Sequence, residues 1–201
     1  LEWKEGQMLL PEEVEALKHY AGFGGLKAVL YPNGPKEEWI KLKASKEDLR
    51  LYEQITELHH LLQQYLKDAE YKQVIDSIKN SILTAFYTPE IVPQTLFSVL
   101  KEQGIEPKNM YEPSSGAGVF VSEAAQVFPS LQTVTAVEKD ILSGRVLTSL
   151  GSSIPVPVLV QVKGFENTSN DEDGKYDLIV SNIPFGSFRV FDESFKDESI
   201  T

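Results

Sequence analysis

The chain has 201 residues, of which 41% are hydrophobic, and it carries a formal net charge of −11. This composition is typical of a globular protein with one well-filled core, and no run of roughly eighteen apolar residues predicts a membrane span. The absence of Cys excludes disulfides and thiolate metal sites and suits a cytoplasmic location. Non-specific binding to nucleic acid depends mainly on Lys and Arg side chains that neutralise phosphates, so the negative net charge argues against such binding by this chain alone. Residue 1 is Leu, and nothing near it resembles a secretory signal, so we expect a piece of a longer protein.

Residues 1–83 are predicted to form an N-terminal helical region. The stretch LPEEVEALKHY is amphipathic and ends at the glycines of AGFGGL. Ser45 and Asp48 have the spacing of a capping box, which opens a helical segment that extends to Leu66. His59 and His60 are adjacent on this segment and therefore point apart, so they cannot chelate a metal ion together. No metal site is predicted.

Residues 84–201 follow a different pattern. Thr88 as N-cap, Pro89 at the first helical position and Gly104 as a stop predict one helix. After it, helical stretches alternate with the apolar strands NMYEP, TVTAVEKD and VPVLVQVK, and a polar loop around NTSNDEDG precedes the last strand, YDLIVSN. This alternation predicts an α/β fold with a mostly parallel sheet of about four strands, in which ligands bind beyond the carboxyl ends of the strands.

The ends of the first two predicted strands carry candidate binding residues. In EPSSGAG, Gly116 and Gly118 form a turn where the missing Cβ atoms let backbone approach a ligand. Such a turn equally joins a strand to a helix, and no Gly-Lys-Ser/Thr follows, which excludes a phosphate loop. The second strand ends at Glu138, where nucleotide sites place a carboxylate against ribose hydroxyls. Taken alone, Glu138 equally fits a solvated loop charge.

The third predicted strand is followed by Gly164-Phe165-Glu166. The Phe165 ring is suited to cover an adenine, and the Glu166 carboxylate can accept a hydrogen bond from its exocyclic amine. Without the other strand ends, Phe165 would be interpreted as a core residue and Glu166 as a surface residue.

The fourth predicted strand ends in SNIPFG, residues 181–186. Pro184 stiffens this segment and biases Ile183 toward an extended conformation. The Asn182 amide and the Ile183 carbonyl are then held close together beside the Phe185 ring. Two fixed acceptors beside an aromatic face suit a planar base that carries an amino group. By accepting both amine hydrogens they localise the nitrogen lone pair for attack, so no proton-abstracting residue is required.

Taken in order, the segments TAFYTP, YEPSSGAGVF, VEKD, GFE and SNIPFG resemble the motif series of S-adenosylmethionine-dependent N6-adenine DNA methyltransferases. The resemblance is strongest to the branch found in large phage, plasmid and conjugative-element proteins, where the methylase is joined to a superfamily-two helicase. The segments AGFGGL and FRVFDESF are also similar to that branch. The resemblance implies a Rossmann-like methyltransferase core over residues 84–201, S-adenosylmethionine as cofactor and DNA as partner. It further implies that the remaining strands, a target-recognition domain and a helicase lie in the rest of a larger polypeptide.

The resemblance also implies roles for individual residues. Asn182 and the Ile183 carbonyl would bind the target amine, and Phe185 would stack on the flipped base. Family patterns commonly read Asn-Pro-Pro-aromatic, and Ile183 replaces the first proline while Pro184 retains the second. The resemblance implies that the methionine end of the cofactor lies under Phe86, Tyr87, Thr88 and Pro89. Its pocket would be lined by Glu112, Pro113, Gly116 and Gly118. Glu138 would bind the ribose, and Phe165 and Glu166 would bind the adenine.

Two alternatives keep the same sequence features. Related enzymes use a similar loop on RNA bases or on glutamine side-chain amides. The acidic charge mildly favours them, whereas the upstream GFGG segment and the tail that resembles mobile-element proteins oppose them. A catalytically degenerate module in a mobile-element protein would also fit the change at Ile183, although Asn182 and Phe185 oppose it. Because about four of seven expected strands are present, the last strand should show an unpaired edge unless another segment covers it. We expect this chain alone to bind cofactor weakly and to methylate little or nothing.

Overall fold

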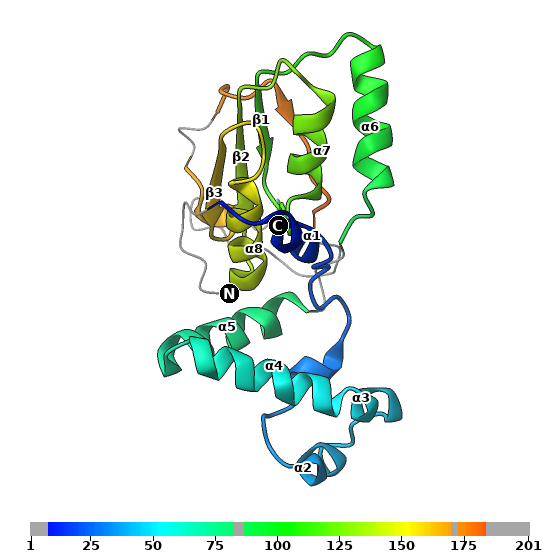
Figure 1. Ribbon diagram of the computed structural model, residues 1–201, viewed down its shortest axis with the longest axis vertical. Helices are drawn as coiled ribbons and strands as arrows, with labels where there is room; N and C mark the ends of the chain where they lie inside the picture. The colour runs from blue at the N-terminus through cyan, green and yellow to red at the C-terminus, as the bar shows by residue number, and fades with distance from the viewer. Residues whose placement is uncertain (1–7, 83–86, 170–172, 184–201) are drawn as a thin grey trace, which may run out of the picture. The chain divides into compact units, whose positions relative to one another are not determined.

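The computed structural model describes residues 8–82, 87–169 and 173–183. They form two compact units, which Figure 1 shows. The sheet unit comprises Leu1–Gly22 and Phe86–Thr201, and the helical unit comprises Phe23–Ala85. The helical unit is therefore inserted between two parts of the sheet unit in the sequence.

Among the described residues, the sheet unit contains four parallel strands. They are β1 (Asn109–Glu112), β2 (Thr133–Glu138), β3 (Val158–Val162) and β4 (Leu178–Ile179). Their order across the sheet is β3-β2-β1-β4, and each neighbouring pair is parallel. The α/β class and the parallel sheet predicted from the sequence are confirmed.

Helices cover one face of this sheet (Figure 1). They are α6 (Ile91–Glu102), α7 (Val119–Val127) and α8 (Ile141–Gly151). A short helix near the N-terminus, α1 (Pro11–Lys18), contacts α8, and a 3-10 turn, η2 (Phe165–Asn167), follows β3. Successive parallel strands joined by helices on one face are what right-handed crossovers produce.

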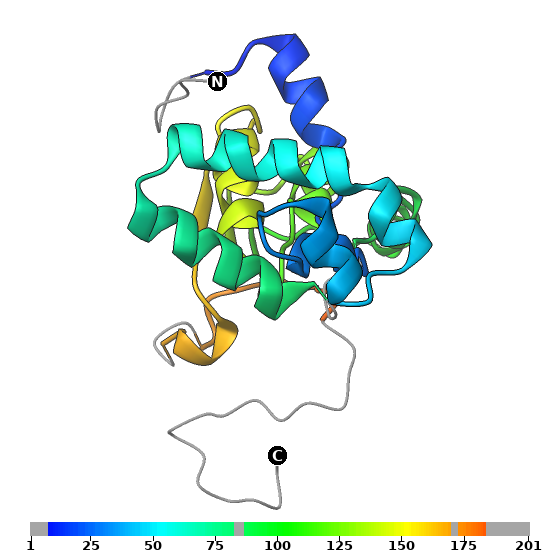
Figure 2. The ribbon, with the colours of Figure 1, turned by 90° about the horizontal axis from the view of Figure 1, so that it is seen from below.

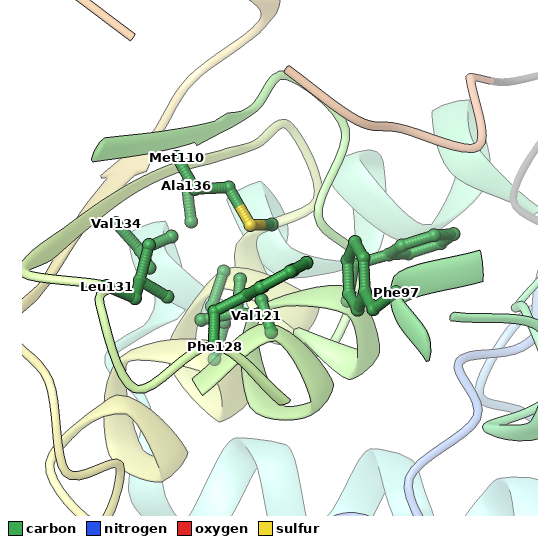
Figure 3. Close-up of a cluster of buried hydrophobic side chains, with 10 residues drawn as sticks. Phe97, Met110, Val121, Phe128, Leu131, Val134 and Ala136 are labelled. Carbon is green, nitrogen blue, oxygen red and sulfur yellow. The ribbon is translucent and has the colours of Figure 1, made fainter. Parts of the chain in front are cut away.

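The core lies between this helical layer and the sheet (Figure 3). Phe97 is fully buried in this core, and its ring meets those of Phe120 and Phe128 edge-on at centroid distances of 6.0 and 5.4 Å. Edge-to-face rings at this spacing add to the stabilisation from burial alone. The buried members of the cluster are Phe97, Met110, Phe120, Val121, Ala124, Phe128, Leu131, Val134, Ala136 and Leu147.

Side chains on the opposite face of the sheet are partly open. Leu159 and Ile179 are 60% and 65% exposed, whereas Tyr111 is buried and stacks on Tyr176 at 4.8 Å. Within the described residues β4 pairs only with β1, so it lies at an edge of the sheet as expected.

The helical unit contains four helices and one 3-10 turn among its described residues. These are η1 (Lys27–Leu30), α2 (Lys36–Lys41), α3 (Lys46–Arg50), α4 (Tyr52–Tyr65) and α5 (Asp68–Ser81). The last two lie side by side and run in opposite directions (Figure 2).

A buried tryptophan on α2 packs against aromatic residues of this unit. Trp39 stacks on Tyr31 at 4.9 Å, meets Tyr52 edge-on at 5.1 Å, and donates its indole N–H to the Pro32 carbonyl at 2.9 Å. Burying an indole requires such a partner for its N–H. The unit therefore has an aromatic core of its own.

The sequence-based boundaries differ from the structure in three places. The predicted helical region began at residue 1, but α1 belongs to the sheet unit and the helical unit begins at Phe23. The segment opened by the Ser45 capping box is confirmed at its start but divides at Leu51 into α3 and α4. Thr88 is not the N-cap of α6, which begins two residues later than predicted, although Gly104, with φ of +80°, ends it as expected.

The two adjacent histidines have different environments. His59 is buried and its Nδ1 lies 2.8 Å from the Tyr71 hydroxyl, whereas His60 is exposed. Burial lowers the pKa of His59, and the positive charges of His60 and Lys79 lower it further.

This asymmetry predicts an acid-sensitive helical unit. The unfolded chain takes up a proton at His59 near its ordinary pKa of 6.5, while the folded chain resists it. The contribution of His59 to stability is therefore present above pH 6.5 and is lost as the pH falls, by at most about 1.4 kcal/mol per pH unit. Thermal unfolding across this range should show the dependence in wild type and in His60→Gln but less of it in His59→Gln. An unchanged profile in His59→Gln would contradict the assignment.

Candidate functional site

The carboxyl ends of the four strands meet at one edge of the sheet. In the parallel register Glu112 pairs with Ala136, and Glu138 pairs with Val162. We call the segments that follow these strands, residues 112–118, 138–140, 164–166 and 181–183, the rim. Ligands of open parallel sheets bind at such an edge.

A glycine turn follows β1. Its start is fixed by the Ser115 N–H, which donates to the Val137 carbonyl at 2.9 Å, and by the Ser115 hydroxyl, which donates to the Glu112 carbonyl at 2.9 Å. Pro113 lies half-buried in this turn. Gly116 has φ of +56°, and a Cβ there would lie only 3.1 Å from Cε1 of Tyr87. A glycine is needed here because of its backbone conformation and because an aromatic ring approaches closely.

Gly118 serves packing at the N-terminus of α7. It has φ of +89°, and a Cβ there would overlap Cδ1 of Leu147 on α8. The sequence predicted that Gly118 lines a ligand pocket, whereas its described neighbours explain the glycine by helix packing.

Gly118→Ala should therefore destabilise the sheet unit strongly. The left-handed conformation costs about 1–2 kcal/mol for a residue with a Cβ, and overpacking adds about 1–3 kcal/mol. Denaturant unfolding should show both terms in Gly118→Ala. Gly174→Ala, which has φ of +72° but no atom within 4 Å of the new Cβ, should show only the first. Equal losses in the two variants would exclude the packing role.

Glu138 is held at the end of β2 by backbone amides. Its Oε2 accepts from the Gly116 N–H at 2.7 Å, and its Oε1 accepts from the Asp140 N–H at 2.6 Å. Burial raises the pKa of Glu138, while these amide hydrogen bonds oppose the shift. The carboxylate thus joins the glycine turn to the start of α8.

Glu112 is a buried carboxyl at the end of β1. It is 1% exposed, and its Oε2 has no hydrogen-bond partner among the described residues. Burial raises its pKa well above the ordinary value, and the nearby negative charge of Glu138 raises it further. A buried carboxyl oxygen without a hydrogen-bond partner is costly for a fold, so its presence at a strand end points to a ligand.

Tyr87 lies across the glycine turn. Its hydroxyl hydrogen-bonds to Oγ of Ser143, which also donates to Oδ1 of Asp140 at 2.8 Å. Tyr20, from the segment after α1, meets the Tyr87 ring edge-on at 6.1 Å, and its hydroxyl lies 3.4 Å from the same Ser143 oxygen. Burial raises the pKa of Tyr20 to about 12 and raises that of Tyr87 still further. Both hydroxyls therefore stay protonated.

Asn182 contacts the residue after Tyr87. Its Nδ2 donates to Oγ1 of Thr88 at 3.0 Å, which fixes the orientation of the side-chain amide. Pro89 is exposed, and its carbonyl accepts from the Val92 N–H at 3.0 Å. Ile183 follows with a side chain that is 61% exposed. Phe86, Pro184 and Phe185 lie outside the described residues.

Phe165 and Glu166 follow β3 at the rim. The Phe165 ring is 57% exposed and lies 6.5 Å from that of Tyr111. Glu166 forms an ion pair with Lys139 at 2.8 Å. Lys139 directly follows Glu138, so Glu166 is linked to the end of β2.

Predicted site residues from distant parts of the sequence therefore meet at the rim. Contacts run from Asn182 to Thr88, and from Tyr87 to Gly116 and on to Glu138. Sequence reasoning missed three participants: Tyr20, Asp140 and Ser143. The sequence signal near Tyr20 is the neighbouring segment AGFGGL, whose residues by themselves indicate no chemical role.

The fold and the rim define the class of protein: an α/β protein with a parallel sheet and a candidate ligand site at the carboxyl ends of its strands. Within the described ranges, no group of three or more His, Asp or Glu residues is arranged to hold a metal ion. In the same part of the chain, every helix is too short or too polar to cross a membrane.

Sequence comparison relates the chain to two viral proteins. It is 30% identical over 124 residues to defense against restriction protein B of Escherichia phage P1, which covers 58% of this chain and 5% of that protein. It is 29% identical over 119 residues to type II methyltransferase M.CvrRI of Paramecium bursaria Chlorella virus XZ-6E, which covers 59% of this chain and 29% of that protein. The chain thus spans only a small part of the curated relatives it matches. No protein-family model matches it.

Solved structures give partial likenesses. A putative RNA methyltransferase from Pyrococcus horikoshii is 23% identical with a TM-score of 0.43, covering 53% of this chain and 52% of that one. An O-methyltransferase from Bacillus cereus is 14% identical with a TM-score of 0.41, covering 63% and 60%.

Proposed function

We propose that the chain is part of an S-adenosylmethionine-dependent methyltransferase that acts on the exocyclic N6 amine of adenine in DNA. The motif series of the sequence supports this proposal, as does the similarity to a type II methyltransferase. The observation that carries it is the hydrogen bond from Asn182 to Thr88, because it joins the proposed amine-binding loop to the proposed cofactor segment.

The rim has groups that fit each part of the cofactor. The buried Glu112 carboxyl, whose Oε2 lacks a described partner, would accept from the ammonium group, and Glu138 would accept from the ribose hydroxyls. Phe165 would cover the adenine. Glu166 would accept a hydrogen bond from the adenine amine while it keeps its ion pair with Lys139. When bound, the cofactor supplies an electrophilic methyl group on a positively charged sulfur.

Asn182 and Ile183 would position the target amine. The side-chain oxygen of Asn182 and the Ile183 carbonyl each accept one amine hydrogen, which directs the nitrogen lone pair toward the methyl carbon. Methyl transfer from the bound cofactor would leave the amine with one surplus proton, which it would release to solvent, while Asn182 and the Ile183 carbonyl would hold the nitrogen in place. Positioning and oriented dipoles supply the rate enhancement.

Charge bears on the choice of substrate. The helical unit has equal numbers of acidic and basic residues, so the whole excess of negative charge lies in the sheet unit. DNA would have to be held by a local patch or by another part of a longer polypeptide. RNA carries the same phosphate charge, so of the alternative substrates only glutamine amides avoid this requirement.

Labelled methyl transfer distinguishes these substrates. A longer polypeptide that carries the chain is incubated with methyl-labelled cofactor and duplex DNA, RNA or protein. We expect label at N6 of adenine in DNA. Label found only in RNA or protein would overturn the DNA assignment. Absence of cofactor binding in calorimetry would instead favour an interaction module.

A further inference from the structure

The segment before the helical unit reaches the rim. Tyr20 and Gly22 lie between α1 and the helical unit in the sequence, yet both contact Tyr87, which follows that unit. Gly22 has φ of +62°, and a Cβ there would overlap Cε2 of Tyr87. The described structure thus gives a specific reason for the first glycine of AGFGGL.

Tyr87 is enclosed from several sides. Its Cε2 edge faces Gly22 and its Cε1 edge faces Gly116, so the ring is held between two glycine backbones. The Tyr20 ring is nearly perpendicular to it, at 84°. Its hydroxyl is bound to Ser143, at the start of α8. We call Tyr20, Gly22 and Ser143 the tyrosine clasp.

We propose that the tyrosine clasp is a positioning device for the ligand site: it holds Tyr87 across the glycine turn as one wall of the cofactor pocket. Because Thr88 follows Tyr87 directly, the clasp also sets the hydroxyl that orients Asn182. Tyr20 and Gly22 thereby become part of the site although the helical unit separates them from Tyr87 in sequence. The inference rests on the proposed function in so far as the ligand is S-adenosylmethionine.

The clasp itself is tested without ligand. In the free chain, nuclear Overhauser contacts are expected between the Gly22 α-protons and the Tyr87 ring protons. Their absence would overturn the clasp whether or not any cofactor binds. This measurement separates failure of the inference from failure of the proposed function.

Its role in binding is tested with two matched glycine variants. Gly22→Ala and Gly24→Ala both place a Cβ on a left-handed glycine of AGFGGL, but only the first meets Tyr87. Titration with S-adenosylmethionine, followed by NMR, should show affinity at least about tenfold weaker in Gly22→Ala and nearly unchanged in Gly24→Ala. Equal weakening in both variants, or none in Gly22→Ala, would overturn the positioning role.

A double-mutant cycle identifies the residue through which Gly22 acts. Tyr87→Ala removes the ring, so adding Gly22→Ala to it should cause no further loss of affinity. Additive losses would mean that Gly22 acts on stability rather than through Tyr87, which contradicts the proposal. If wild type shows the ring contacts but does not bind S-adenosylmethionine, the clasp stands and its assignment to this cofactor fails.

Discussion

Replacing Asn182 with alanine is expected to slow methyl transfer by about 10²- to 10³-fold while leaving cofactor affinity nearly unchanged. The side chain is proposed to accept an amine hydrogen in the transition state, and its orientation is fixed by Thr88 at 3.0 Å. An interaction made mainly with the reacting amine lowers kcat rather than the affinity for the other substrate. Single-turnover transfer to adenine-containing duplex DNA by a longer polypeptide that carries the chain, with a parallel cofactor titration, measures both quantities.

Asn33 provides a matched control for this variant. Its Nδ2 also donates to a side-chain oxygen, Oε1 of Gln63 at 3.2 Å, but it lies in the helical unit. Asn33→Ala should therefore transfer methyl groups at the wild-type rate. Thr88→Val, which keeps the shape but removes the hydroxyl, should slow transfer by about tenfold. Undiminished transfer by Asn182→Ala would exclude the proposed amine site.

Features set by local sequence were predictable. Apolar runs predicted the four strands of the described residues: helical stretches separate the first three, and the polar loop NTSNDEDG precedes the fourth. The strand ends placed Glu112, Glu138 and Asn182 near one edge. A parallel sheet brings its carboxyl ends together whatever the loops contain, so local pattern is enough to locate the rim. The Ser45 capping box was equally local, because its two partners are three residues apart.

Features set by distant contacts were not predictable. A side chain at Gly22 would overlap Tyr87, and one at Gly118 would overlap Leu147, and neither partner is near in sequence. The helix α1 was predicted to belong to the helical region because its own residue pattern is helical. In the structure it contacts α8 and therefore belongs to the sheet unit. Periodicity reports which face of a helix is apolar but not which surface it covers.

Glu112→Gln is expected to stabilise the chain above neutral pH and to weaken cofactor binding by about 10- to 100-fold. The folded-state pKa of Glu112 is raised, so the unfolded chain loses this proton first and stability falls as pH rises from 4.5 toward the folded pKa. Glutamine does not titrate and removes that loss. It also removes the charge that would pair with the cofactor's ammonium group. Thermal unfolding against pH and cofactor titration measure the two effects.

Proton release upon binding separates this carboxyl from others with raised pKa values. Pairing with an ammonium group lowers the pKa of Glu112, so wild type should release a proton when the cofactor binds, and Glu112→Gln should not. Glu123 on α7 also has a pKa raised by burial, but its neighbours are Gln94, Glu90 and Lys18 rather than the rim. Glu123→Gln should therefore change the pH dependence of stability and retain proton release, as measured by calorimetry in buffers of different ionisation enthalpy. Proton release that persists in Glu112→Gln would assign the ammonium contact to another group.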